Sequence, residues 1–208
     1  MWYPILIAFL SAYLLGNLNG AVSISVLFSH EDVRTQGSGN AGLTNFVRGY
    51  GGWGTALVLL IDVGKTVLGC LLAGLLLKPY GLYDEGKMLG AVAVTLGHDF
   101  PATLGFKGGK GVLCGLAAAA AIDWRIALMI GAAFLITYFI TKYVSLGSLM
   151  GALFFGIGFC VFWHHKPWVM VGGLFLALMV FIMHRKNIVR LFKGEERKTN
   201  LFSGKKQE

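Results

Sequence analysis

Long, nearly uninterrupted apolar runs are the feature that most constrains how this chain folds. Seven of them follow one another along the 208 residues, at 5–28, 53–77, 88–104, 111–122, 126–140, 144–163 and 168–183. A helix needs about 20 apolar residues to cross a bilayer, and four of the runs have about that length. The shorter runs 111–122, 126–140 and 168–183 are typical of tilted or partly re-entrant helices that pack against protein. Because charged residues make up only 13% of the chain, the pattern predicts an all-α, polytopic integral membrane protein.

The number of spans depends on Asp123-Trp124-Arg125, which is either a turn or part of one long helix. As a turn, it gives seven spans and places 13 Lys and Arg residues on one side of the membrane against four on the other. The thirteen are Arg34, Arg48, Lys107, Lys110, Lys142, Arg185, Lys186, Arg190, Lys193, Arg197, Lys198, Lys205 and Lys206, and the four are Lys78, Lys87, Arg125 and Lys166. A single long helix gives 11 against five and leaves two charges in hydrocarbon, at about 3 kcal/mol or more each. The positive-inside rule therefore favours seven transmembrane helices, with the N-terminus outside and the C-terminus in the cytoplasm.

The chain is interpreted as a single membrane domain over residues 1–208, with a basic cytoplasmic tail at 184–208. The first run lacks a basic leading region and a small-residue cleavage site, so we expect a retained span rather than a signal peptide. The charge of the tail indicates attraction to anionic lipid rather than to nucleic acid. Cys70, Cys114 and Cys160 lie in or beside apolar runs without CxxC spacing, so no disulfide or metal site is predicted.

The loop over 29–52 contains HEDVRTQGSGNAGLTNFVRGYGG, with six glycines. Its short polar side chains are Ser38, Asn40, Thr44 and Asn45, and Arg34 and Arg48 bracket them. Gly37 and Gly39 let the backbone turn so that successive amide groups form a concave nest for an anion. Arginine adds a bidentate fork for phosphate oxygens. A flexible glycine linker is the alternative, but it gives no reason for this density of polar groups, so we favour a phosphate site.

A second cluster, GHDFPATLGFKGGKG, covers residues 97–111. Lys107, Gly108, Gly109 and Lys110 lead directly into an apolar helix, whose N-terminus offers amide donors and the positive end of its dipole to an anion. The Walker A pattern is absent because Gly105 and Gly109 are spaced wrongly for it, so nucleotide hydrolysis is not supported.

Several polar residues elsewhere can be interpreted either as structural or as part of the site. Ser148, in KYVSLGS, either packs helices or joins the site. His184 and Asn187 lie three residues apart and therefore share a helix face. Asp62 and Lys65 form a possible ion pair within a span, either structural or part of a polar pocket. His98 and Asp99 precede Pro101, and the structural reading is favoured for the histidine.

Four segments in the same order resemble the bacterial acyl-phosphate:glycerol-3-phosphate acyltransferase family, the membrane PlsY type. They are DVRTQGSGNAGLTNFVRGYG at 32–51, GHDFPATLGFKGGKGV at 97–112, KYVSLGS at 142–148 and HRKNIVRLFKGEE at 184–196. The resemblance covers nearly the whole chain. It implies transfer of a fatty acyl group from an acyl phosphate to the 1-hydroxyl of glycerol 3-phosphate, which gives lysophosphatidic acid. No cofactor and no acyl-carrier or coenzyme donor is implied.

The resemblance also implies which residues act. The site residues of the family fall on Ser38, Thr44, Arg48, Lys110, Ser148, His184 and Asn187. Substrate-binding positions are further expected at Gly37, Gly39, Asn40, Asn45, Lys107, Gly108 and Gly109. This chain has Gly42-Leu43-Thr44-Asn45 where the family has GATN, and Gly16-Asn17-Leu18-Asn19 where it has GSIP.

The chemistry of acyl phosphate suits this set of residues. The donor is a mixed anhydride with a good leaving group, so the enzyme mainly aligns the hydroxyl with the carbonyl and stabilises negative charge. We expect Arg48, Lys110, His184 and Asn187 to position glycerol 3-phosphate, with Ser38 and the loop amides holding the acyl phosphate. Direct transfer is favoured over an acyl-enzyme on Ser38. The acyl tail is expected to lie between helices, open to membrane lipid.

Two other functions fit parts of the pattern. A phosphate or organophosphate transporter predicts polar residues through the membrane and at both faces, whereas the clusters here stop at the predicted cytoplasmic side of a bacterial inner membrane. A scaffold for lipid-synthesis proteins predicts that Arg48 and Lys110 are dispensable. The expected partners are the two substrates, membrane lipid and a soluble enzyme that produces acyl phosphate.

Overall fold

The computed structural model describes residues 2–199, so the predicted tail cations Lys205 and Lys206 lie outside the described part. Ten α-helices and three short 3-10 helices make up the secondary structure of these residues. The α-helices are α1 (Trp2–Asn17), α2 (Gly20–Ser29), α3 (Leu43–Gly49), α4 (Gly54–Leu77), α5 (Tyr83–Asp99), α6 (Val112–Ile122), α7 (Trp124–Thr141), α8 (Val144–Trp163), α9 (Pro167–Met183) and α10 (Arg185–Phe192). The 3-10 helices are η1 (Val33–Thr35), η2 (Lys78–Tyr80) and η3 (Ala102–Leu104). The expected all-α class is confirmed.

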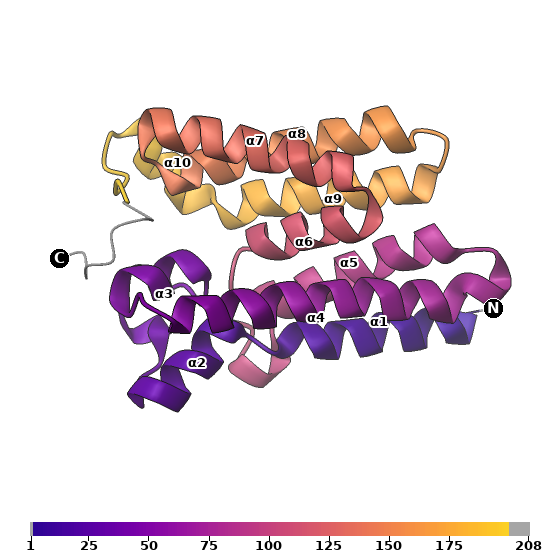
Figure 1. Cartoon of the computed structure of the whole chain (residues 1–208), viewed down its shortest axis with the longest axis horizontal. Helices are drawn as coiled ribbons and strands as arrows, with labels where there is room; N and C mark the ends of the chain where they lie inside the picture. The colour runs from indigo at the N-terminus through magenta and orange to yellow at the C-terminus, as the bar shows by residue number, and fades with distance from the viewer. Residues whose placement is uncertain (1, 200–208) are drawn as a thin grey trace.

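The long helices run side by side in two groups, with α1, α4 and α5 in one and α7, α8 and α9 in the other, and the short α6 between them (Figure 1). Four segments are long and apolar enough to cross a membrane, namely Trp2–Ser29, Gly54–Tyr80, Trp124–Thr141 and Val144–Trp163. The pair α9 and α10, bent by 57° at their junction, makes a fifth if the two count as one span. Helices α5 and α6 are shorter, with 17 and 11 residues. Length and composition thus support four or five spans.

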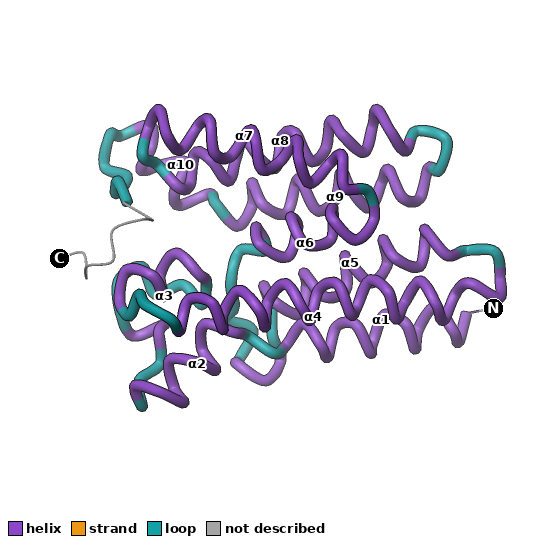
Figure 2. The backbone as a smooth tube through the Cα atoms, viewed as in Figure 1, coloured by secondary structure: helices purple, strands orange, loops and turns teal. Residues whose placement is uncertain are grey.

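Most loops lie toward the two ends of the bundle, whereas the segment 100–111 between α5 and α6 lies nearer its middle (Figure 2). The segments around α2, α3 and α10 and the turn at 142–143 lie at one end, whereas the connections α4–α5, α6–α7 and α8–α9 lie at the other (Figure 1). The seven-span topology and its orientation stay a prediction.

The turn predicted at Asp123 is present. Asp123 is extended, with φ −152° and ψ 106°, and its carboxylate accepts hydrogen bonds from the amide of Arg125 at 3.0 Å and from Nε1 of Trp163 at 3.1 Å. These bonds end α6 and cap α7, so the two short apolar runs form separate helices.

The first apolar run, by contrast, is not one helix, because it breaks at Leu18 and Asn19. The Oδ1 atom of Asn19 accepts a hydrogen bond from the amide of Val22 at 3.0 Å and so caps α2. Its Nδ2 atom donates to the carbonyl of Ala41 at 2.9 Å, which ties the break to the glycine-rich loop. The polar residues at the departure from the family pattern therefore turn the chain toward that loop.

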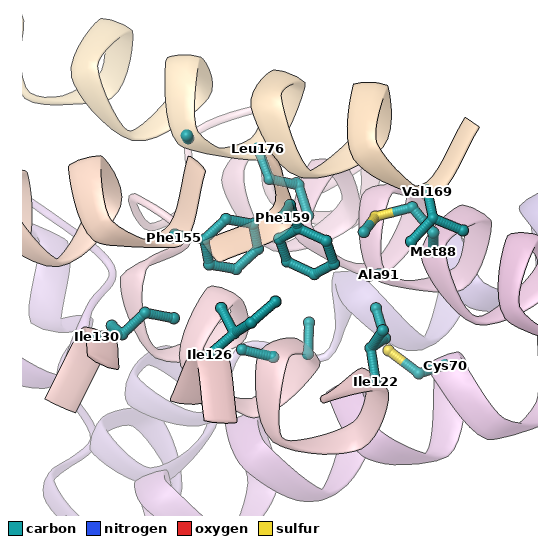
Figure 3. Packing of buried hydrophobic residues seen from close by; sticks show 13 residues of the cluster. Cys70, Met88, Ala91, Ile122, Ile126, Ile130, Phe155, Phe159, Val169 and Leu176 are labelled. Atoms are coloured by element: carbon teal, nitrogen blue, oxygen red, sulfur yellow. The ribbon is translucent and has the colours of Figure 1, made fainter. Parts of the chain in front are cut away.

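The main apolar core packs the helices from α5 through α9 together. Phe155, Phe159 and Ile126 lie together at its centre, and Met88 and Val169 extend it along the bundle (Figure 3). Where α1 crosses α5, Gly16 and Gly97 bring the two backbones into contact, because a Cβ atom at either position would overlap the opposite helix. Small residues thus set the helix spacing on one side of the bundle and aromatic residues fill the other.

Candidate active site

A cavity of about 690 Å³ opens between the glycine-rich loop, α3, the start of α6 and helices α7 to α10. Most of its polar lining comes from loops and helix ends: Ser38, Asn40, Thr44, Asn45, Arg48, Lys110, Ser145, Ser148, His184, Asn187, Arg190, Glu196 and Arg197. Helices α4 and α5 add Asp62, Thr95, His98 and Asp99. Its apolar lining comes from the middle turns of the helices: Leu116, Ile130, Phe134, Leu135, Phe155, Leu176 and Val180. One compartment thus offers both a charged binding surface and space for a hydrocarbon chain.

The side chain of Asn45 holds the GSGN turn in shape. Its Oδ1 atom accepts hydrogen bonds from the amide of Ser38 at 2.9 Å and from its Oγ at 3.2 Å. Its Nδ2 atom donates to the carbonyls of Val33 at 2.8 Å and Gln36 at 3.1 Å. Gly37 has φ +58° and packs so closely on Asn45 that no Cβ fits. Asn45 therefore orients Ser38 in the cavity wall.

Arg48, on α3, presents its guanidinium to the cavity and is tied to the end of the described chain. Its Nε atom donates to Oγ1 of Thr199 at 3.0 Å, and Nη2 contacts the same oxygen. Thr199 is in turn held by bonds from its amide to the carbonyl of Lys142 and from the hydroxyl of Tyr138 to its carbonyl, both 3.1 Å. Burial lowers the pKa of Arg48, which remains a cation at neutral pH.

Lys110 lies at the centre of a polar network between α6 and α10. Its Nζ atom donates to Oδ1 of Asn187 at 2.6 Å, and Nδ2 of Asn187 donates to Oε1 of Glu196 at 2.7 Å. Nε of Arg190 donates to the second oxygen of the same carboxylate at 2.7 Å. Burial lowers the pKa of Lys110 to about 8; Glu196 opposes this shift, and Arg190 and Arg48 add to it. Arg48, Lys110 and Arg190 thus line the same cavity.

His184 sits at the bend between α9 and α10 and lines the cavity. Its Nδ1 atom lies 2.8 Å from the carbonyl of Val180, an acceptor, so Nδ1 carries a proton and the neutral ring keeps its lone pair on Nε2. Ser148 also lines the cavity, and its Oγ donates to the carbonyl of Val144 at 2.9 Å. Both residues thus lie in the wall of the same cavity, and their roles in binding stay a prediction.

The structure does not bring every predicted binding residue into the cavity. The amides of Gly108 and Gly109 donate to the carbonyls of Asp99 and His98, at 3.1 and 3.0 Å, so they are not free to bind phosphate. Lys107 is exposed, and its carbonyl accepts a hydrogen bond from Arg34 at 3.1 Å. The amide of Gly39 closes a turn onto Gln36 at 3.0 Å. Of the residues in the loop 105–111, Lys110 and Gly111 line the cavity.

Asp62, Lys65 and His98 form a buried cluster that lies against the loop 105–111. Nζ of Lys65 lies 2.8 Å from Oδ1 of Asp62 and 2.9 Å from Nδ1 of His98. The same ammonium donates to the carbonyls of Gly16 and Leu18, where α1 ends. The cluster therefore ties the break in the first apolar run to α4 and α5, and Asp62 and His98 also line the cavity.

Sequence reasoning missed Glu196 and Arg190 as part of the site. Both lie in the last matching segment, HRKNIVRLFKGEE, where the sequence predicts only a basic cytoplasmic tail. The contact of Glu196 with Asn187 depends on the chain folding back after α10, a turn marked by Gly194 with φ +70°.

The chain is similar to known proteins over nearly its whole length. A sequence model of the family described as glycerol-3-phosphate acyltransferase matches residues 6–194. A glycerol-3-phosphate acyltransferase of Clostridioides difficile (strain 630) is 42% identical over 188 residues, covering 90% of this chain and 91% of the relative. One of Anaeromyxobacter dehalogenans (strain 2CP-C) is 41% identical over 191 residues, covering 90% and 94%.

Two crystal structures of PlsY (YgiH), an integral membrane glycerol 3-phosphate acyltransferase, share the fold. The glycerol 3-phosphate form has a TM-score of 0.85 and 31% identity, covering 94% of this chain and 96% of that one. The lysophosphatidic acid form has a TM-score of 0.83 and 29% identity, covering 96% and 97%.

Proposed function

The chain belongs to the glycerol-3-phosphate acyltransferase family and is an integral membrane enzyme that makes lysophosphatidic acid, and we propose that its acyl donor is an acyl phosphate. The observation that carries the proposal is the cavity itself. Arg48, Lys110 and Arg190 gather at its polar wall, while the middle turns of α6 to α9 supply an apolar wall. Two phosphate-bearing substrates, one with a fatty chain, fit such a compartment.

In the proposed complex, Lys110, Arg48, His184 and Asn187 hold glycerol 3-phosphate. The hydrogen bond from Lys110 to Asn187 already fixes the ammonium, so little side-chain entropy is lost when phosphate binds. Ser38 and the neighbouring loop amides hold the phosphate of the donor, and the acyl chain lies between Phe134 and Phe155.

The reaction we propose is direct transfer. The oxygen of the 1-hydroxyl attacks the acyl carbonyl carbon, the bond from that carbon to the phosphate oxygen breaks, and the departing phosphate takes the hydroxyl proton. An acyl-enzyme on Ser38 would need a base beside Oγ, whereas Oγ donates to the amide oxygen of Asn45 at 3.2 Å. An amide oxygen does not act as that base, which supports direct transfer.

We further propose the seven-helix topology, with the N-terminus outside and the active site on the cytoplasmic face of a bacterial inner membrane. Support comes from the 13 against four distribution of Lys and Arg and from the position of α2, α3 and α10 at one end of the bundle (Figure 1). Such a site would receive acyl phosphate from a soluble enzyme and release its product into lipid.

An acyl-transfer assay tests the proposal. Purified protein in detergent is incubated with labelled glycerol 3-phosphate and either palmitoyl phosphate or palmitoyl-CoA. Labelled lysophosphatidic acid is expected with palmitoyl phosphate and not with the thioester. Lys110→Ala and Arg48→Ala serve as inactive controls, and full activity of either in this assay would contradict its proposed role in binding phosphate. A scaffold would be favoured only if these variants kept activity in cells. No product, together with phosphate flux in liposomes, would overturn the enzyme in favour of a transporter.

A further inference from the structure

Thr95 and Asp99 form a polar patch on the cavity wall that the catalytic network does not use. They lie four residues apart on α5, so their side chains share one face of that helix. Both line the cavity, with exposed fractions of 3% and 1%. Within residues 2–199, neither the hydroxyl of Thr95 nor either carboxylate oxygen of Asp99 has a hydrogen-bond partner.

Gly111 brings this patch next to the phosphate-binding network. A Cβ atom on Gly111 would lie 3.2 and 3.3 Å from the two carboxylate oxygens of Asp99 and 2.7 Å from Cγ2 of Thr95. Gly111 directly follows Lys110 and has φ +68°, a conformation that favours glycine. The patch therefore lies one residue along the chain from the proposed phosphate ligand.

A buried polar group without a partner costs free energy, so its retention beside a substrate cavity calls for a ligand that satisfies it. The acyl chain offers no hydrogen bond to these oxygens, and the phosphates of both substrates are already placed on Lys110, Arg48 and Ser38. The groups that fit are hydroxyl donors. Glycerol 3-phosphate carries two, and the 1-hydroxyl must face the acyl carbonyl. The 2-hydroxyl is left for this patch.

We propose that Asp99 and Thr95 bind the 2-hydroxyl of glycerol 3-phosphate and so select this acceptor over phosphates that lack it. The proposal rests on the function given above. Asp99 accepts the hydrogen bond of the 2-hydroxyl, and Oγ1 of Thr95 donates to the same oxygen. With the phosphate on Lys110 and the 2-hydroxyl on α5, the acceptor is held at two points, which directs its 1-hydroxyl toward the donor.

The test compares two acceptors on the same preparation. The kcat/KM for glycerol 3-phosphate is divided by that for 3-hydroxypropyl phosphate, which keeps the reacting hydroxyl but lacks the 2-hydroxyl. The wild type is expected to prefer glycerol 3-phosphate about tenfold to a hundredfold, as for one or two hydrogen bonds to a charged or polar partner. Because both constants come from one sample, the ratio does not depend on the fraction of folded enzyme.

Asp99→Leu is expected to bring the ratio to within about threefold of unity, and Thr95→Val to lower it by about fivefold. Asp99→Asn, which keeps an acceptor of the same size, should fall between the wild type and Asp99→Leu, and it decides the matter if the leucine variant does not fold. Thr66→Val is the matched control, because Thr66 is also buried on a helix but bonds to the carbonyl of Asp62 at 2.7 Å. It should keep the wild-type ratio.

Two kinds of failure are distinguishable. Acylation of neither acceptor by the wild type would overturn the function itself. Acylation of glycerol 3-phosphate with no preference, or with a preference that Asp99→Leu, Asp99→Asn and Thr95→Val leave unchanged, would overturn only the role of Asp99 and Thr95.

Discussion

The Nζ atom of Lys110 lies 2.6 Å from Oδ1 of Asn187 and joins the start of α6 to α10 across 77 positions of sequence. The same asparagine donates to Glu196, so one neutral side chain holds a cation on one side and an anion on the other. A change in α10 that displaces Asn187 is therefore expected to alter phosphate binding at Lys110.

Removing this link should weaken the use of glycerol 3-phosphate. Asn187→Ala is expected to lower kcat/KM by about tenfold to a hundredfold, because the ammonium and the carboxylate both lose a partner in a buried place. Steady-state kinetics with varied glycerol 3-phosphate measures it. Lys186→Ala is the control, since Lys186 is exposed on the same helix; an equal loss there would point to disruption of α10 as a whole.

The depressed pKa of Lys110, about 8, sets a limit on the alkaline side. Below that pH the side chain is a cation and attracts phosphate; above it the charge is lost, so kcat/KM should fall as pH rises through about 8. On the acid side it should fall below pH about 6, where phosphate monoesters gain their second proton. The pH profile of kcat/KM checks both limbs.

Lys110→Arg separates this cause from others, because a guanidinium keeps its charge well above pH 8. Even at reduced activity, its alkaline limb should move to higher pH. A limb that stays in place would show that another group titrates there.

The apolar part of the cavity should set the acyl-chain preference. Gly131 lines it, and a Cβ atom added there would meet nothing within 4 Å. Gly131→Leu should therefore be tolerated by the fold but fill space that a long chain needs. We expect the activity ratio of palmitoyl phosphate to octanoyl phosphate to fall at least about tenfold, in line with several buried methylenes at about 0.8 kcal/mol each.

Gly64→Leu is the matched control for this change. Gly64 also has no atom within 4 Å of an added Cβ, but it lies on α4 and does not line the cavity. The ratio of the two donors should stay as in the wild type, and an equal fall in both variants would contradict a role for the cavity.

The buried pair of Asp62 and Lys65 should matter for stability. Lys65→Met leaves the carboxylate of Asp62 without its ammonium partner, at a cost of about 3–5 kcal/mol in the free energy of unfolding. The double variant Asp62→Leu/Lys65→Met should recover part of that loss, since no charge remains buried alone. Thermal unfolding in detergent measures both, and a single variant as stable as the wild type would refute the structural role.

The helices follow closely from the sequence, because apolar runs of this length have few other solutions. The turn at Asp123 was also predictable, since its charges are costly in hydrocarbon. The break at Leu18 and Asn19 was not, because it depends on a cap and on a bond to Ala41 far along the chain.

The same difference holds at the site. Ser38, Arg48, Lys110, His184 and Asn187 do line one cavity, as their motifs predict. The amides of Gly108 and Gly109 do not face it, because they donate to backbone carbonyls at the end of α5. A glycine motif does not reveal such backbone pairing. Glu196 and Arg190 depend on a chain reversal after α10, which the sequence marks only by a glycine.

Thr199, at the end of the described residues, holds the side chain of Arg48 in place. It touches Arg48, the carbonyl of Lys142 and the hydroxyl of Tyr138, yet it is not among the residues of the cavity wall. A protein shortened to end before Thr199 is therefore expected to lose activity. Arg48, which we propose binds phosphate, would lose the hydrogen bonds that hold its guanidinium.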